Sequence, residues 1–205
     1  MRPLLLSVLL SVLLIAGCSP SAPTGNTVSG TANDAAPAAT NTAIAATPTP
    51  EPLRPAAPGQ PGGLPDDKAP VSEAPFTPDS PQGAATVVQT YYALIASGQY
   101  VDAWALWGDK GGASGQSVDA FVASFAKYSE YHANIGAPGR EDAGAGQRYV
   151  AVPVQVYARL KDGTPAYWIG SVVLHRTGDV DGATAEDKVW RIKSIDLKPA
   201  PPAAK

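Results

Sequence analysis

Few residues in this sequence are suited to acid–base or nucleophilic chemistry. The 205-residue chain contains one cysteine, Cys18, and two histidines, His132 and His175. Histidine is the side chain whose pKa is most easily tuned for proton transfer near neutral pH. Either one could act as a base beside Tyr92, Glu130 or Asp102. Lone histidines near the ends of helices and strands more often only bond to water or to a neighbour. His132, His175 and Asp102 are therefore catalytic candidates, but the sequence does not group them into a catalytic dyad or triad.

No motif in the sequence predicts a metal or a cofactor. With a single cysteine, neither an intramolecular disulfide nor a Cys/His zinc spacing is available. Residues 179–182 (DVDG) resemble the start of a calcium loop, but Trp190 stands at the position where such a loop needs Glu. We expect an Asp-Gly turn there instead. Ser114, in GASGQ (112–116), has no preceding strand, so it is not a hydrolase nucleophile elbow.

Aromatic side chains recur through the second half of the chain. They could line a pocket for an apolar or sugar-like ligand, because aromatic walls are common in such sites. The same helical spacing also describes residues that simply pack into a core. Both readings stay open for the six ligand-pocket candidates, which are Tyr91, Tyr92, Trp104, Trp107, Phe125 and Trp190.

Three amphipathic helices must position these residues. The first covers residues 81–97, with Ser80 or Asp79 as its cap and a proline at its first position. The second covers about residues 100–107. The third covers residues 117–128 and also begins with a serine cap. Each helix carries an apolar stripe, so each needs a surface to cover.

The residues after the helices alternate as strands do. The segment 147–160 (QRYVAVPVQVYARL) is followed by a hairpin turn at 161–164 and a return strand at 166–177. A last strand is expected at 188–197 and a weaker one near 132–137. Helices followed by an antiparallel meander predict an α+β domain over residues 81–198, in which helices pack on a curved sheet.

The alternation also predicts which side chains face the helices. If the valines at 150, 152, 154 and 156 point inward, the residues that point outward are Tyr149, Gln155, Tyr157 and Arg159. Trp190 and Ile192 point inward, and the interior then contains no carboxylate. The outer face would offer a contact for another protein or for a second copy through Tyr149, Tyr157, Tyr167 and Ile169.

The order of elements resembles the nuclear-transport-factor-like superfamily, whose cone-shaped fold includes ketosteroid isomerase and is also described as cystatin-like. The residues that carry the resemblance are YYALIASGQY (91–100), DAWALW (102–107) and WRIKSI (190–195). Enzymes of this superfamily place an acid or base inside the cone. Since the superfamily also includes ligand binders and interaction modules, the resemblance alone selects no function.

The N-terminus reads as an export signal. Arg2 precedes an apolar run over residues 4–15, which is too short to span a bilayer as a helix. Residues 14–18 (LIAGC) resemble the lipobox of bacterial lipoproteins, in which the thiol is diacylated and the chain is cut before the cysteine. The resemblance implies a signal peptide over residues 1–17 and a mature protein that begins at Cys18 and carries acyl chains such as palmitate. A plain secretory signal and an uncleaved anchor are the alternatives.

Residues 18–80 are rich in Pro, Ala and Thr and poor in bulky apolar residues. Such a segment can bury little surface to offset chain entropy, so we predict a disordered tether. A proline-rich ligand for a partner is the alternative, although TPTPEP and APGQP lack a repeated charged PxxP pattern. Residues 199–205 are predicted to be a frayed tail.

The overall charge of the chain bears on which partners it could bind. The net charge of −3 gives no electrostatic reason to expect nucleic acid as a partner. We expect a lipid-anchored cell-envelope protein whose domain binds an envelope partner, a second copy or a small apolar ligand without catalysis. In a host with two membranes, Ser19 after the cysteine implies the outer membrane, facing the periplasm. The alternative is an isomerase- or dehydratase-like enzyme that uses His or Asp in the cone.

Overall fold

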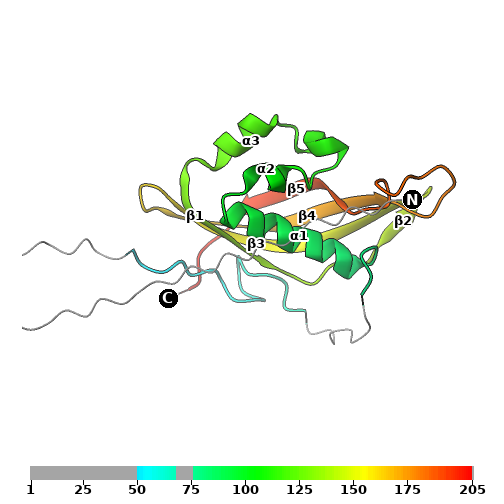
Figure 1. Ribbon diagram of the computed structural model, residues 1–205. Coiled ribbons are helices and arrows are strands. Elements are labelled where there is room, and N and C mark those ends of the chain that lie inside the picture. Colours follow the sequence, from blue (N-terminus) through cyan, green and yellow to red (C-terminus); the bar gives the residue numbers. More distant parts are fainter. Residues whose placement is uncertain (1–49, 68–75, 205) are drawn as a thin grey trace, which may run out of the picture. The chain divides into compact units, whose positions relative to one another are not determined.

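The computed structural model describes residues 50–67 and 76–204. The predicted signal peptide, the predicted lipidation site at Cys18 and the first part of the predicted tether lie outside the described residues. Within them the chain forms an α+β domain, with helices on one face of an antiparallel sheet, as the sequence predicts and as a cone-like fold requires (Figure 1).

The helices begin where the caps predict. Helix α1 (Pro81–Ala96) starts after Ser80, whose side chain accepts a hydrogen bond from the Gly83 N–H. Helix α3 (Val118–Phe125) starts after Ser117, whose side chain accepts from the Ala120 N–H. Between them lie α2 (Tyr100–Trp104) and the short 3₁₀ helix η1 (Asp109–Ser114).

The sheet has the order β1-β3-β4-β5, and every pairing is antiparallel. The long strands β3 (Gln147–Leu160) and β4 (Pro165–Thr177) form the predicted hairpin. The short strand β2 (Asp142–Gly144) pairs with the start of β3. The outer strands are β1 (Tyr128–Ile135) and β5 (Arg191–Pro199).

Several element boundaries differ from the sequence prediction. Helix α2 ends at Trp104 and not near residue 107, and the strand expected near 132–137 spans Tyr128–Ile135. Tyr128 belongs to β1 and not to the third helix, because α3 ends at Phe125 and Tyr128 pairs with Leu160. The apolar spacing of Tyr128 still fits its place, since its ring contacts Phe125. The last strand begins at Arg191 and not at 188, so the predicted inward residue Trp190 directly precedes the strand.

The core lies between α1 and the inward face of the sheet. Val150, Val152, Val154 and Val156 are buried on β3, and Val88 and Ile95 are buried on α1. Trp190 is also buried, and its indole N–H donates to the Ser80 carbonyl at 3.1 Å. This bond ties the start of α1 to the end of the sheet.

Part of the opposite face of the sheet is covered, which the sequence does not predict. Residues 51–64, which we call the strap, lie against it and are shown in cyan in Figure 1. The prediction of a disordered tether is therefore wrong for this part of residues 18–80. The strap is held in place with little buried apolar surface, because side chains of the sheet donate hydrogen bonds to its main-chain carbonyls.

The strap also explains two buried polar side chains. Gln155 and Arg159 point outward on β3 as the alternation predicts, yet they are only 2% and 7% exposed. Outward-pointing side chains are expected to be exposed to solvent, but the strap covers these two. The predicted frayed tail after residue 198 is likewise wrong for its first part, since the Ala200 N–H donates to the Tyr167 carbonyl and the Ala203 N–H donates to the Arg54 carbonyl.

Candidate functional site

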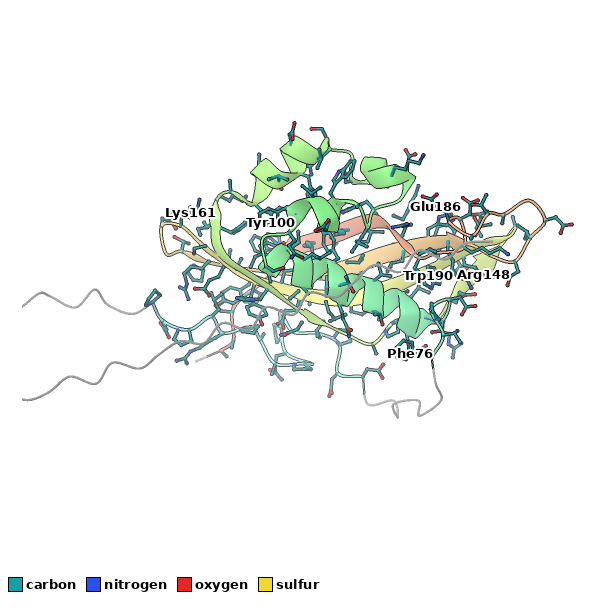
Figure 2. All side chains as sticks on the ribbon, viewed as in Figure 1. Phe76, Tyr100, Arg148, Lys161, Glu186 and Trp190 are labelled. Carbon is teal, nitrogen blue, oxygen red and sulfur yellow. The ribbon has the colours of Figure 1, made fainter. Side chains whose placement is uncertain are left out.

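An open groove of about 550 Å³ lies beside β5, between the segment that follows α2 and the loop that precedes β5. Figure 2 labels Glu186 on this loop. The groove brings together three residues that the sequence singled out for chemistry or ligand contact: His175, Trp104 and Trp107. No other described cavity combines a histidine with two tryptophans.

Trp104 is held by the loop around η1. Its indole N–H donates to the Ser114 hydroxyl at 3.1 Å and to the Gln116 carbonyl at 3.2 Å. The ring packs on Gly111, where a Cβ would lie 2.4 Å from ring atoms. Gly111 also has a φ of 93°, a conformation that favours glycine. Gly111 therefore lets the Trp104 ring form one wall of the groove.

Trp107 is fixed by the edge of the sheet. It forms an isolated bridge with Ile192, and the neighbouring Gly108 N–H donates to the Ile192 carbonyl at 2.9 Å. The Ile192 N–H in turn donates to the Leu106 carbonyl at 3.0 Å. These bonds cover part of the free edge of β5 and hold one side of the groove against the sheet.

His175 lies on β4 and is partly buried. Its Nε2 donates to the Gln147 side-chain carbonyl, and its ring lies 4.8 Å from the ring of Tyr149. Desolvation, with a further contribution from the Lys193 charge, lowers the pKa of His175 below its usual range. The side chain is therefore neutral at neutral pH, with Nδ1 as its remaining acceptor.

The rim of the groove carries both signs of charge. Lys110 and Arg191 lie near Asp109, Glu186 and Asp187. Asp109 and Lys110 have φ values of 53° and 51°, so two consecutive non-glycine residues adopt the left-handed conformation. Each costs on the order of 1–3 kcal/mol. Hydrogen bonds from Thr184 lower the pKa of the Asp187 carboxyl, which keeps it charged.

No motif or spacing in the sequence indicates these rim residues. Lys110 and Arg191 come from segments that are far apart in the chain, and only the contact between the end of α2 and β5 brings them to one groove. Arg191 is held there by a hydrogen bond from its Nη1 to the Ala105 carbonyl, at 3.2 Å.

The other aromatic candidates belong mainly to the packed core. Tyr91 and Trp190 are buried, and Phe125 packs against the core. The Tyr91 ring contacts Trp107 and Phe121, and burial raises the pKa of its hydroxyl well above the usual range. These side chains fill the space between the helices and the sheet, so they are core residues and do not line a ligand pocket.

Tyr92 and His132 line a smaller groove of about 250 Å³ beside Tyr157. The Tyr92 hydroxyl is buried without a hydrogen-bond partner among the described residues, and its ring stacks on Tyr131. His132 is exposed on β1, with its Nε2 4.0 Å from a Glu130 carboxyl oxygen. The two histidines therefore line different grooves and form no pair.

Asp102 is exposed on α2 and lines none of the described grooves. The buried polar or charged residues in the described part of the chain are Gln155, Arg159 and Arg176, and none is a carboxylate. Within residues 50–67 and 76–204, no three His, Cys, Asp or Glu side chains cluster as metal ligands would. The helices in these ranges are all too short or too polar to cross a membrane.

Comparison with known proteins adds a fold likeness. No protein-family model and no curated protein matches the chain. Among solved structures, the Kfla4162 protein from Kribbella flavida resembles it with a TM-score of 0.41 and 14% sequence identity. The match covers 60% of this chain and 93% of that protein. The likeness concerns the fold alone.

Proposed function

We propose that this protein is a lipid-anchored cell-envelope protein whose α+β domain binds a small ligand without transforming it. The anchor rests on residues 14–18, whose sequence LIAGC resembles a lipobox. Two or more acyl chains on Cys18 would hold the protein firmly, since each buried methylene contributes about 0.8 kcal/mol. In a host with two membranes, the protein would face the periplasm.

The observation that supports ligand binding is the groove beside β5. Its volume of about 550 Å³ suits a small molecule. Trp104 supplies most of the aromatic contact surface, since Trp107 is only 8% exposed, while Lys110 and Arg191 supply donors at the rim. A ligand with a flat or sugar-like body and an acidic group would use both kinds of contact.

The second candidate is an enzyme of the isomerase or dehydratase kind. One observation favours it: His175 lines the groove and is neutral at neutral pH, as a general base must be. The polar neighbour of its ring is the amide of Gln147, where a catalytic pair would place a carboxylate. Binding without catalysis therefore accounts for more of the groove.

The test uses two exposed valines. Val189 lines the groove and is 48% exposed, whereas Val180 is 44% exposed and lies outside the groove. Small acidic aromatic and sugar compounds are screened by tryptophan fluorescence and thermal shift. Any ligand found should lose binding in Val189→Arg, where the new side chain fills the groove, and keep it in Val180→Arg. Equal binding by both variants would contradict the assignment to this groove.

Catalysis is separated from binding by turnover. Compounds that bind are incubated with the wild-type protein and with His175→Gln, and products are followed by NMR. The proposal expects bound compounds to stay unchanged in both. Conversion by the wild type that is lost in His175→Gln would establish the enzyme alternative.

A further inference from the structure

The sheet face under the strap has the features of a peptide-binding site. The Gln155 side-chain amide donates to the carbonyls of Ala56 and Gly62, both at 2.8 Å. Arg159 donates through Nη2 to the Glu51 carbonyl at 2.6 Å. The contacts are thus made by side chains of the sheet to the main chain of the strap.

The donors are oriented by the sheet itself. The Asn134 side-chain amide donates to the Gln155 carbonyl oxygen at 2.8 Å, so the Gln155 NH₂ group must point at the strap. Glu130 binds the Arg159 Nε at 2.9 Å, which leaves other guanidinium N–H groups for the strap and for Gly163. Tyr167 adds a hydroxyl that accepts from the Arg54 N–H at 3.0 Å.

This arrangement suits a proline-rich chain. The strap has the sequence EPLRPAAPGQPGGL, with prolines at every third position from 52 to 61. Because proline has no N–H, such a chain offers mainly carbonyl acceptors, and a face that supplies donors is complementary to it. Ala56 is 4% exposed, so a small side chain is required at the point of closest contact.

The start of the strap, residues 51–54, does not fill the space next to the sheet. A cavity of about 870 Å³ lies beside Glu51, lined by Arg159, Tyr167 and the prolines at 50, 52, 165 and 202. A bound peptide would find room there for residues beyond those that contact Gln155. This cavity shares no residue with the groove beside β5.

We propose that the sheet face formed by Asn134, Gln155, Arg159 and Tyr167 is a binding site for proline-rich segments of a partner polypeptide, and that the strap occupies it in cis. A partner segment of similar sequence binds when the strap leaves. Covalent attachment gives the strap a high effective concentration, so it competes strongly with any free peptide. The inference does not depend on the proposed ligand groove.

The test uses the full-length mature protein in detergent micelles and a fluorescent peptide with the sequence of residues 50–66. Ala56→Asp in the protein should displace the strap, because the larger, charged side chain would have to be desolvated at a position that is only 4% exposed. Peptide binding, measured by anisotropy, should then be at least about tenfold tighter than in the wild type. A peptide that carries the same Ala56→Asp change should not bind.

Gln155→Glu, added to the Ala56→Asp protein, should abolish binding, since the carboxylate accepts where the amide donated. Tyr167→Phe is a milder second variant, which removes one hydroxyl and should weaken binding. Gln60→Ala, at an exposed position of the strap, is the matched control and should behave as the wild type. Equal peptide binding by the wild type and Ala56→Asp, or unchanged binding after Gln155→Glu or Tyr167→Phe, would overturn the proposal.

Discussion

Replacing Gln155 by Ala should release the strap and leave the sheet folded. The substitution removes both hydrogen bonds from the Gln155 amide to the strap and the bond that Asn134 donates to Gln155. A typical hydrogen bond contributes about 0.5–1.5 kcal/mol to stability. Loss of the two strap bonds should therefore weaken docking of the strap by about 2 kcal/mol.

A loss of about 2 kcal/mol corresponds to a roughly 30-fold change in the ratio of docked to released strap. The global free energy of unfolding should fall by no more than the docking energy, because carbonyls of a released strap bind water. The core on the other face is untouched, since Val154 and Val156 make their contacts with the helices' side of the sheet.

Amide hydrogen exchange measures the two regions separately. The Gly59 and Gly63 N–H groups donate within the strap, to the carbonyls of Leu64 and Gln60, both at 2.8 Å. In Gln155→Ala these amides should exchange roughly 30-fold faster. Amides in the β3–β4 ladder, such as that of Val152, should keep their rates. Gln60→Ala is the control and should change neither region.

Two results would contradict this role of Gln155. Unchanged exchange at Gly59 and Gly63 would mean that Gln155 does not hold the strap. Equal acceleration at Val152 would mean that Gln155 stabilises the whole sheet and that the strap is no separate unit.

Three further predictions concern the groove and the start of the domain. Gly111→Ala should lower the free energy of unfolding by about 3 kcal/mol, because the added Cβ meets the Trp104 ring at a positive φ. Gly115→Ala, which also has a positive φ but open space around it, should lower it by only about 1 kcal/mol. Urea unfolding measures both values. His175 takes up a proton near pH 6.5 in the unfolded chain but only at lower pH in the folded protein. The contribution of neutral His175 to stability is therefore complete above about pH 6.5 and is lost as the pH falls below that value. His175→Asn should reduce the loss of thermal stability between about pH 7 and pH 5. Ser80→Ala should lower the unfolding free energy by about 1 kcal/mol through loss of the α1 cap, and Ser80→Asp should restore it.

The sequence predicts the elements whose signals are local. Ser80 with Pro81 marks the start of α1, and the alternating valines of β3 mark both the strand and its inward face. These signals depend on neighbours within a few residues, which is why they can be read without the fold.

The features that the sequence does not predict depend on contacts between distant segments. The segment EPLRPAAPGQPGGL contains no local signal of order. Its carbonyls accept hydrogen bonds from Gln155 and Arg159, which lie about a hundred residues later in the chain, so the order depends on contacts that the segment itself does not reveal. His175 and Trp104 are each visible as candidates, but only the meeting of the α2 segment with β5 places them in one groove. The charged rim of that groove arises in the same way.

The chemical state of Cys18 tests the proposed lipid anchor most directly. The wild type and Cys18→Ser are expressed in a bacterial host with radiolabelled palmitate, followed by membrane fractionation and mass spectrometry of the N-terminus. We expect the wild-type mature chain to begin at Cys18, to carry label and to sediment with the membrane. The Cys18→Ser chain should be unlabelled and released. An unmodified Cys18, or equal labelling of both proteins, would contradict the proposed anchor.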